Sequence, residues 1–184
     1  MNIMMFKEVS SSLKTIADKI PDFSKNVIND VPKDNSDINQ SAFANSLSTR
    51  NHRLEGQRHP ETDVPFQRKT VEMENGDKVE GVFPVFESRF NAELPEELLD
   101  ASDNLQFKEC NSQLKNWVDG EPDKAKNFFS EDQLSDISNG RIPEGYTWHH
   151  SEDKGVLQLV DTEIHADTGH TGGKTIWGGG NDNR

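Results

Sequence analysis

The sequence predicts a small mixed α+β domain, and three patterns lead to that class. Apolar and polar residues alternate on both sides of the Asn75-Gly76 dipeptide, as they do in a β-hairpin. Apolar residues then recur at helical spacing between residues 107 and 118. Near the C-terminus, two short alternating segments precede a helix-capping residue, which gives the order strand, strand, helix.

Composition limits the size of this domain. Of the 184 residues, 31% are hydrophobic and 29% are charged, and the formal net charge is -13. Such a chain can form one modest core, while much of it buries little apolar surface. The acidic balance argues against a protein that coats nucleic acid by charge alone, because that binding depends on Lys and Arg displacing counterions. It remains compatible with an enzyme that has a local basic groove.

Cysteine content and hydropathy bear on where the protein works. The single cysteine, Cys110, excludes an intramolecular disulfide framework and cannot form a structural zinc site alone, which is consistent with a reducing compartment. The first twenty residues lack the apolar run of a signal peptide, and no later segment approaches the roughly 18 apolar residues of a membrane span. We therefore expect a protein without a membrane span, and one that would leave its cell, if it does so, by a route other than a signal peptide.

Three regions follow one another along the chain. Residues 1–20 carry apolar side chains at alternating spacings of three and four and precede Pro21, which predicts an amphipathic helix for docking or self-association. Residues 21–57 are rich in Asn, Ser and Asp without a sustained period, which predicts a disordered polar linker. The character changes at Arg58, so we place the folded domain at residues 58–184.

The first elements of that domain have clear local signals. Residues 67–73 and 78–83 should pair as strands around Asn75-Gly76. Pro95 suits a first helical turn, and a helix face follows with Cys110 as a small core hydrophobe rather than a nucleophile. The segment Ser130-Glu131-Asp132-Gln133 matches a capping box and begins a further helix, which Asn139-Gly140 ends.

The last elements surround an unusual concentration of histidine. Residues 146–150 and 156–160 should form two strands joined by a polar turn, and Asp161 can cap a helix that runs to about residue 167. Of the six histidines in the chain, four lie between residues 145 and 173, namely His149, His150, His165 and His170.

Strand geometry separates the two adjacent histidines. His149 and His150 must point to opposite sides of a strand, so that one can face a metal ion while the other faces a substrate. His165 and His170 could reach the same point as one of them, which would place three imidazoles around one cation. Three protein ligands with an open position are typical of a catalytic metal site, whereas a closed structural site normally has four.

These motifs resemble a known family. The strand Trp148-His149-His150, the strand 157–160 with the sequence LQLV, and the ending His165-x4-His170-Thr-Gly-Gly resemble the ββα-metal, or His-Me finger, nucleases of the HNH superfamily. They are most similar to the WHH and colicin-DNase-like toxin modules at the C-termini of bacterial polymorphic toxins. The resemblance covers about residues 143–180, with the finger at about 145–173, and the GVFPVF and QFKEC segments are also similar to parts of that module.

The resemblance implies roles for individual residues. His149, His165 and His170 would hold one divalent metal ion (Mg2+, Zn2+, Mn2+ or Ni2+), and His150 would act as the general base. The central Asn of the superfamily has no counterpart between His150 and His165, and Gln158 is the nearest substitute for orienting the base. Because His165 and His170 are five residues apart, His170 should come from the helix end or the loop beyond it.

Candidate contacts with nucleic acid are less specific. Arg58, Arg68 and Lys69 form a locally basic entry to the domain, and Lys174 follows a Gly-Gly pair that could approach a phosphate, although each is equally typical of ordinary surface charge. Two tryptophans, Trp148 and Trp177, could stack on bases, with core packing favoured for the first of them.

The resulting hypothesis is a metal-dependent endonuclease that hydrolyses phosphodiester bonds in DNA with little sequence preference. The resemblance further implies a bacteriocin-like toxin that is cytoplasmic in its producer and exported without a signal peptide. It would act in the cytoplasm of a competing cell and be neutralised in its producer by a cognate immunity protein. Two alternatives remain open. One is an RNase or tRNase toxin of the same fold, and the other is a non-catalytic binding module stabilised by zinc.

Overall fold

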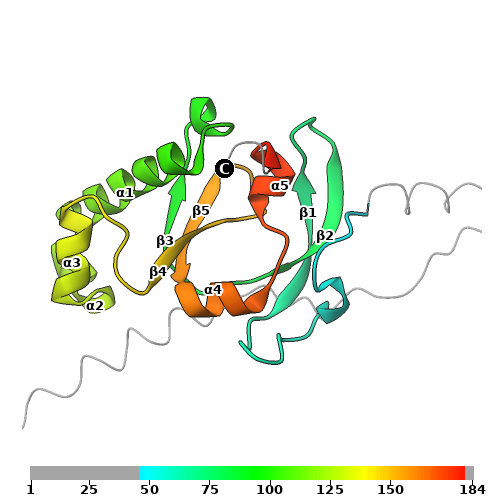
Figure 1. Ribbon diagram of the computed structural model, residues 1–184, viewed down its shortest axis with the longest axis horizontal. Coiled ribbons are helices and arrows are strands. Elements are labelled where there is room, and N and C mark those ends of the chain that lie inside the picture. The colour runs from blue at the N-terminus through cyan, green and yellow to red at the C-terminus, as the bar shows by residue number, and fades with distance from the viewer. Residues whose placement is uncertain (1–45, 181–184) are drawn as a thin grey trace, which may run out of the picture. The chain divides into compact units, whose positions relative to one another are not determined.

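The computed structural model describes residues 46–180, which fold into two small antiparallel sheets and five α-helices (Figure 1). The expected N-terminal helix at 1–20 and most of the expected linker lie outside the described residues. The α+β class is confirmed.

The first sheet is the predicted hairpin. Strands β1 (Phe66–Glu72) and β2 (Lys78–Pro84) pair antiparallel along their full lengths. The turn depends on Gly76, whose φ of 84° is a conformation that glycine adopts without steric cost. The side chain of Asn75 accepts a hydrogen bond from the backbone N–H of Asp77 at 3.0 Å, which stabilises the same turn.

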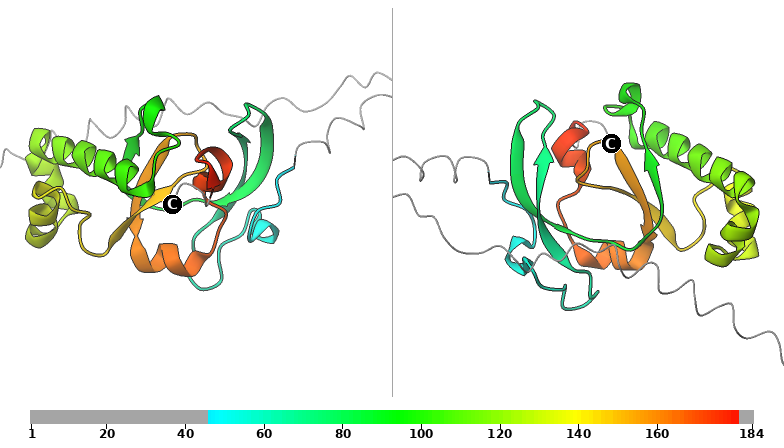
Figure 2. Two further views of the ribbon diagram at one scale, coloured as in Figure 1. Left: turned by 45° about the horizontal axis from the view of Figure 1, so that its top comes forward. Right: turned by 180° about the vertical axis from the view of Figure 1, so that it is seen from behind.

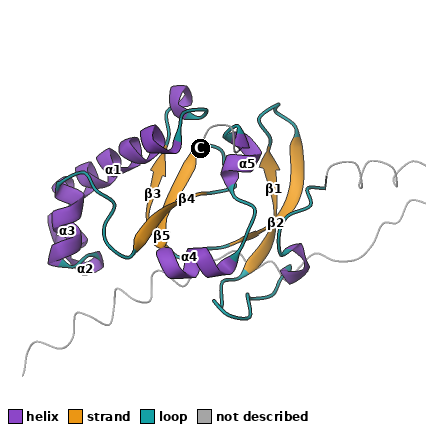
Figure 3. Ribbon diagram, viewed as in Figure 1, coloured by secondary structure: helices purple, strands orange, loops and turns teal. Residues whose placement is uncertain are grey.

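The second sheet has three antiparallel strands in the order β3-β5-β4 (Figure 3). Strands β4 (Tyr146–His150) and β5 (Val156–Asp161) are the predicted pair. Strand β3 (Ser88–Glu93) was not predicted, because the sequence SRFNAE alternates weakly and pairs with a strand almost seventy residues later. In a strand of this kind, tertiary pairing rather than local pattern decides the structure.

Three helices follow β3 and a short 3-10 turn at Glu96–Leu98, which begins directly after Pro95. Helix α1 (Asp103–Gly120) carries the predicted apolar face, and α3 (Glu131–Ser138) begins with the predicted capping box between Ser130 and Gln133. Helix α2 (Pro122–Phe128), with Pro122 in its first turn, was not predicted. Its seven residues are too short to give a clear period.

The core lies between the three-stranded sheet, α1 and the C-terminal residues. The views in Figure 2 show α1 along one side of the sheet, with the hairpin and α5 (Gly173–Trp177) on the other. The largest fully buried apolar side chains are Trp177, Phe66, Phe83, Leu114, Ile137, Leu157, Leu159 and Ile176. Cys110 is buried in the same core, and this burial raises the pKa of its thiol to about 12, so it is the expected small hydrophobe.

The expected linker boundary at residue 58 does not match the packing of residues 46–57. The backbone N–H of Leu47 donates to the Glu80 carbonyl of β2 at 2.8 Å. The buried hydroxyl of Thr49 donates to the Val82 carbonyl at 2.7 Å and accepts from the Val82 N–H. A 3-10 turn at His52–Leu54 follows. Hydrogen bonds to the edge of β2 hold this segment in place. Such bonds leave no apolar pattern in the sequence, which is why the segment was expected to be a linker.

Hydropathy sets one further limit on the described part of the chain. No helix between residues 46 and 180 combines the length and the apolar character needed to cross a membrane.

Candidate metal centre

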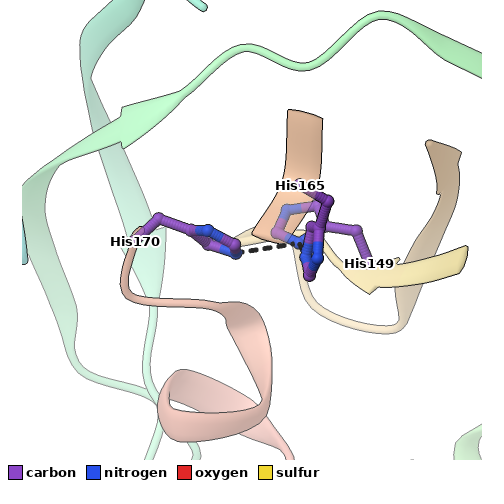
Figure 4. Close-up of side chains that lie close together, drawn as sticks. All are labelled: His149, His165 and His170. Carbon is purple, nitrogen blue, oxygen red and sulfur yellow. Dashed lines mark hydrogen bonds between the residues drawn. The ribbon is translucent and has the colours of Figure 1, made fainter. Parts of the chain in front are cut away.

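Three of the four clustered histidines converge on one point (Figure 4). His149 comes from β4, His165 from helix α4 (Thr162–Thr168), and His170 from the segment between α4 and α5. The Nδ1 atom of His149 lies 3.2 Å from Nε2 of His165 and 3.1 Å from Nε2 of His170. All three nitrogens lie within 4.8 Å of one another.

Local sequence explains how the last two histidines reach this point. The carboxylate of Asp161 accepts a hydrogen bond from the Ile164 N–H at 2.9 Å and so starts α4 directly after β5. Gly169, with a φ of 54°, ends the helix and turns the chain, and His170 follows beyond the helix end. One side chain therefore approaches from within the helix and the other from the chain that folds back past it.

Burial keeps these imidazoles neutral. It lowers the pKa of His149 well below the ordinary value, and the nearby imidazoles of His170 and His165 lower it further. Burial also lowers the pKa of His165, and it lowers that of His170 to about 4 with smaller contributions from His165 and the cation of Arg50. Neutral imidazoles offer their lone pairs to a metal ion at ordinary pH.

Two of the three nitrogen–nitrogen distances suit ligands of a single cation. Metal–nitrogen bonds of about 2.1 Å place two ligands of a tetrahedral site roughly 3.4 Å apart, close to the observed 3.1 and 3.2 Å. His149 Nδ1 has one lone pair or one proton and cannot satisfy two neighbouring ring nitrogens on its own. A shared cation would satisfy all three, and it would leave at least one coordination position open.

The three imidazoles pack against one aromatic ring, and two of them lack a hydrogen bond at their second ring nitrogen. The ring of Phe86 lies against all three imidazoles, with centroid distances of 4.9, 5.5 and 5.2 Å to His149, His165 and His170. The distal nitrogens His149 Nε2 and His170 Nδ1 are buried and have no hydrogen-bond partner within residues 46–180. Metal-bound histidines usually donate that second N–H to an acceptor. Here the rings of His149 and His170 depend on packing and on their backbones for orientation.

His150 lies on the opposite face of β4, away from the three histidines. Its Nε2 atom lies 2.8 Å from Oε1 of Gln106 in α1, and its ring packs against those of Phe107 and Trp177. The amide of Gln106 is fixed, because its NH2 group donates to the carbonyls of Leu98 and Leu99, both at 2.8 Å. The amide oxygen therefore faces His150 and accepts a hydrogen bond from its Nε2–H group.

Gln158 does not take the place expected for it beside His150. In the register of β4 and β5, Gln158 stands directly opposite His149, so both side chains share one face of the sheet. His150 points to the other face. The residue that holds His150 is instead Gln106, which sequence reasoning missed because it precedes His150 by 44 residues and looks like an ordinary polar residue of a helix.

The expected nucleic-acid contacts are mostly neutralised by carboxylates. Arg58 pairs with Asp63 at 3.0 Å, Arg68 with Glu55 at 2.6 Å, and Lys69 with Glu152 at 2.8 Å. Lys174 is only 2% exposed, and its ammonium group lies 3.2 Å from Asp103 and 3.0 Å from Gln106. Lys174 is therefore an internal ion and not a surface contact. Two further candidates, Trp148 and Trp177, are buried and donate their indole N–H groups within the domain.

A different arginine stands beside the histidines. The guanidinium group of Arg50 lies against Gly169, where its atoms would come within 2.8 Å of an added Cβ, and its charge lowers the pKa of His170. Within residues 46–180, no carboxylate lies at ion-pair distance from this exposed side chain. Sequence reasoning missed Arg50 because it lies in the expected linker, and no local signal could have placed it at the centre.

A comparison with known protein families finds a match that covers the histidine cluster. The family model of the DNase/tRNase domain of colicin-like bacteriocins matches residues 75–172, which is more than half of the chain and includes all four clustered histidines. The match does not include Arg50 or strand β1. No curated protein and no solved structure matches the chain.

Proposed function

Because the chain belongs to the family of DNase/tRNase domains of colicin-like bacteriocins, which are nuclease toxin domains, we propose that it is a metal-dependent endonuclease. Its substrate in this proposal is DNA, cut with little sequence preference. The observation that carries the metal dependence is the convergence of three neutral ring nitrogens, from His149, His165 and His170, within 4.8 Å.

Three histidines would hold the cation, and one arginine would bind the substrate phosphate. His149, His165 and His170 would hold a divalent cation, which would supply Lewis-acid stabilisation of the charge that develops on the scissile phosphate and the leaving 3′ oxygen. Arg50 adds a fork of N–H donors beside His170, and it is not already neutralised by a carboxylate of the described residues. We propose Arg50, rather than Arg58, Arg68, Lys69 or Lys174, as the main phosphate contact of the protein.

His150 is the proposed general base. The hydrogen bond between Nε2 and Gln106 orients the ring of His150, and an imidazole in its neutral form can take a proton from an attacking water molecule. Its side chain is 10% exposed, so access to water is narrow. Gln106 replaces Gln158 in this proposal as the residue that orients the base.

An RNase or tRNase activity is the second candidate. The matching family includes both DNase and tRNase domains, so family membership does not choose between the two substrates. An imidazole can also activate the 2′-hydroxyl of RNA, and that reaction would be insensitive to EDTA.

The same family membership supports a proposal for the biological role. We propose that the domain acts as a toxin in the cytoplasm of a competing bacterial cell, and that a cognate immunity protein blocks it in the producer. A candidate immunity protein would be identified if its co-expression restored the growth of cells that express this domain.

Cleavage of supercoiled plasmid by the full chain tests the proposal. The wild type should nick DNA with added Mg2+, Mn2+, Ni2+ or Zn2+ and lose this activity in EDTA. His150→Ala should lower the rate about 10²- to 10⁴-fold while its metal affinity stays unchanged. His59→Ala, outside the cluster, is the matched control and should cut like the wild type.

Each other outcome points to a different conclusion. Full activity of His150→Ala would remove it from the chemistry and leave it a purely structural residue. Cleavage of tRNA but not plasmid, in EDTA, would favour the RNase. If neither nucleic acid is cut and EDTA unfolds the protein, the histidines form a structural zinc site in a non-catalytic module.

A further inference from the structure

His170 is the histidine of the centre that regular structure supports least. Helix α4 ends at Thr168 and helix α5 begins at Gly173, so His170 belongs to neither. Its distal Nδ1 is buried without a hydrogen-bond partner within residues 46–180. The direction of its imidazole therefore depends on the backbone of the loop formed by residues 168–171, here called the His170 loop.

A segment more than a hundred residues earlier holds the His170 loop. The side-chain amide of Asn51 donates hydrogen bonds to the carbonyl of Gly169 at 2.7 Å and to that of Thr168 at 3.1 Å. The backbone N–H of Arg50 donates to the hydroxyl of Thr171 at 2.9 Å. The three bonds fix the loop on both sides of His170. The last carbonyl groups of a helix have no hydrogen-bond partner within it, and the Thr168 carbonyl is one of these in α4.

The backbone conformation of Asn51 and the anchoring of the segment around it hold its side-chain amide in position for this contact. Its φ of 65° is left-handed, a conformation that a non-glycine residue seldom adopts and that asparagine tolerates better than most. Thr49, two residues earlier, is buried, and its hydroxyl donates a hydrogen bond to the Val82 carbonyl of β2 and accepts one from the Val82 N–H. The donor amide is therefore anchored to the hairpin, and it cannot follow the loop if the loop moves.

We propose that Asn51 is a positioning residue of the metal centre, which holds the His170 loop so that the His170 imidazole reaches the cation. The inference rests on the metal ion of the proposed function. It makes residues 49–51, which lie before the region matched by the family model, a part of the centre.

The test compares metal binding by two glycine variants. Asn51→Gly removes the amide donors but accepts the left-handed backbone, so its effect reports on the hydrogen bonds alone. Asn139→Gly is the matched control, because Asn139 also donates its side-chain amide to a carbonyl at a helix end, that of Ser135 in α3 at 2.7 Å, and α3 carries no histidine.

Metal affinity is measured by calorimetric titration of the EDTA-stripped full chain with Ni2+ or Zn2+, without nucleic acid. Asn51→Gly should bind roughly 10- to 100-fold more weakly than the wild type, as expected when an outer-shell partner is lost. Asn139→Gly should bind as the wild type does. If Asn51→Gly does not fold, Thr171→Val decides, because it removes only the acceptor of the Arg50 N–H and should weaken binding by a smaller factor.

Two results would overturn the inference, and they differ in what else they remove. Wild-type affinity in both Asn51→Gly and Thr171→Val would show that the loop needs no clamp, while the metal centre itself would stand. A wild type that binds neither metal would remove the metal centre together with the inference. A wild type that binds metal but cuts no nucleic acid would refute the proposed nuclease and leave this inference to the titration.

Discussion

At the scale of single residues, the side chains of a strand alternate between its two faces, so the adjacent residues His149 and His150 of β4 lie in different environments. His149 enters an apolar setting closed by Phe86, where burial keeps imidazoles neutral. His150 enters a polar one, where its Nε2 is hydrogen-bonded to the amide oxygen of Gln106 and Lys174 donates to that same oxygen. A one-residue shift of β4 would exchange the two settings, so the register with β5 is part of the site.

Arg50 provides a residue-scale prediction. Arg50→Ala should lower kcat/KM for nucleic acid roughly 10²-fold, because it removes charged donors from the phosphate. Arg50→Lys should recover only part of this loss, since an ammonium group lacks the planar fork of donors. Arg53→Ala, an exposed neighbour, is the control and should stay near the wild type. Metal affinity measured in parallel should be unchanged in all three, and equal rates in Arg50→Ala and Arg53→Ala would contradict the proposed phosphate contact.

The same scale shows which site residues a sequence can predict. The clustering of four histidines, and the position of His170 beyond a helix, follow from spacing and a capping residue. Gln106 and Arg50 have no such signal, because each reaches the site through tertiary packing across long stretches of chain. The ion pairs of Arg68 and Lys69 likewise depend on carboxylates brought close by the fold.

At the scale of elements, predictability followed the strength of local signals. The hairpin, α1, α3, β4, β5 and α4 each had a turn, a cap or an apolar period, and all of them formed. The missed elements β3, α2 and α5 are short and lack these signals. Helix α5 has glycine at its first position, and it is stabilised by contacts such as the bond from the Trp177 indole to the Ser151 carbonyl at 2.9 Å.

A buried lysine joins two of these elements and can be tested. Lys174 of α5 donates to the Ala101 carbonyl at 2.9 Å before α1 and lies 3.2 Å from Asp103 within it. Lys174→Met should lower the free energy of unfolding by about 1–3 kcal/mol, less than for a fully buried pair because Asp103 is 30% exposed.

Urea denaturation of the EDTA-treated protein measures the change, with Lys124→Met as the control. Lys124 pairs with Glu121 on the surface at 3.2 Å, and its loss should cost no more than about 0.5 kcal/mol. The double variant Asp103→Asn with Lys174→Met should be more stable than Lys174→Met alone, because no unpaired carboxylate remains. Equal losses in Lys174→Met and Lys124→Met would show that the internal ion contributes nothing to the joint between α5 and α1.

At the scale of the whole molecule, the centre depends on contacts between segments that are far apart in the sequence. His149, His165 and His170 lie within 22 residues of one another, yet their arrangement uses Phe86 from the chain before β3 and residues 49–51 from the segment along β2. Contacts this distant in sequence form only when the domain is folded. The lone pairs of three buried imidazoles therefore become available together, and their state should report on the stability of the entire domain.

This coupling predicts a loss of stability in acid for the metal-free protein. The folded pKa values of His149, His165 and His170 lie below 6.5, whereas exposed imidazoles of the unfolded chain titrate near that value. Below about pH 6.5 the unfolded state binds more protons than the folded state, so the free energy of unfolding falls as the pH falls toward the folded pKa of His170, about 4.

Urea denaturation in EDTA at pH 7, 6 and 5 measures this slope, in a range where most carboxylates remain ionised. The wild type should lose roughly 1–3 kcal/mol between pH 7 and 5, and His170→Gln, which cannot titrate, should lose less. Saturating Zn2+ or Ni2+ at pH 7 should raise the unfolding free energy by mass action, and acid should remove that gain as protons displace the metal. A wild type whose stability does not change between pH 7 and 5 would mean that the three imidazoles are solvated in the metal-free state, because burial is the largest cause of their lowered pKa values.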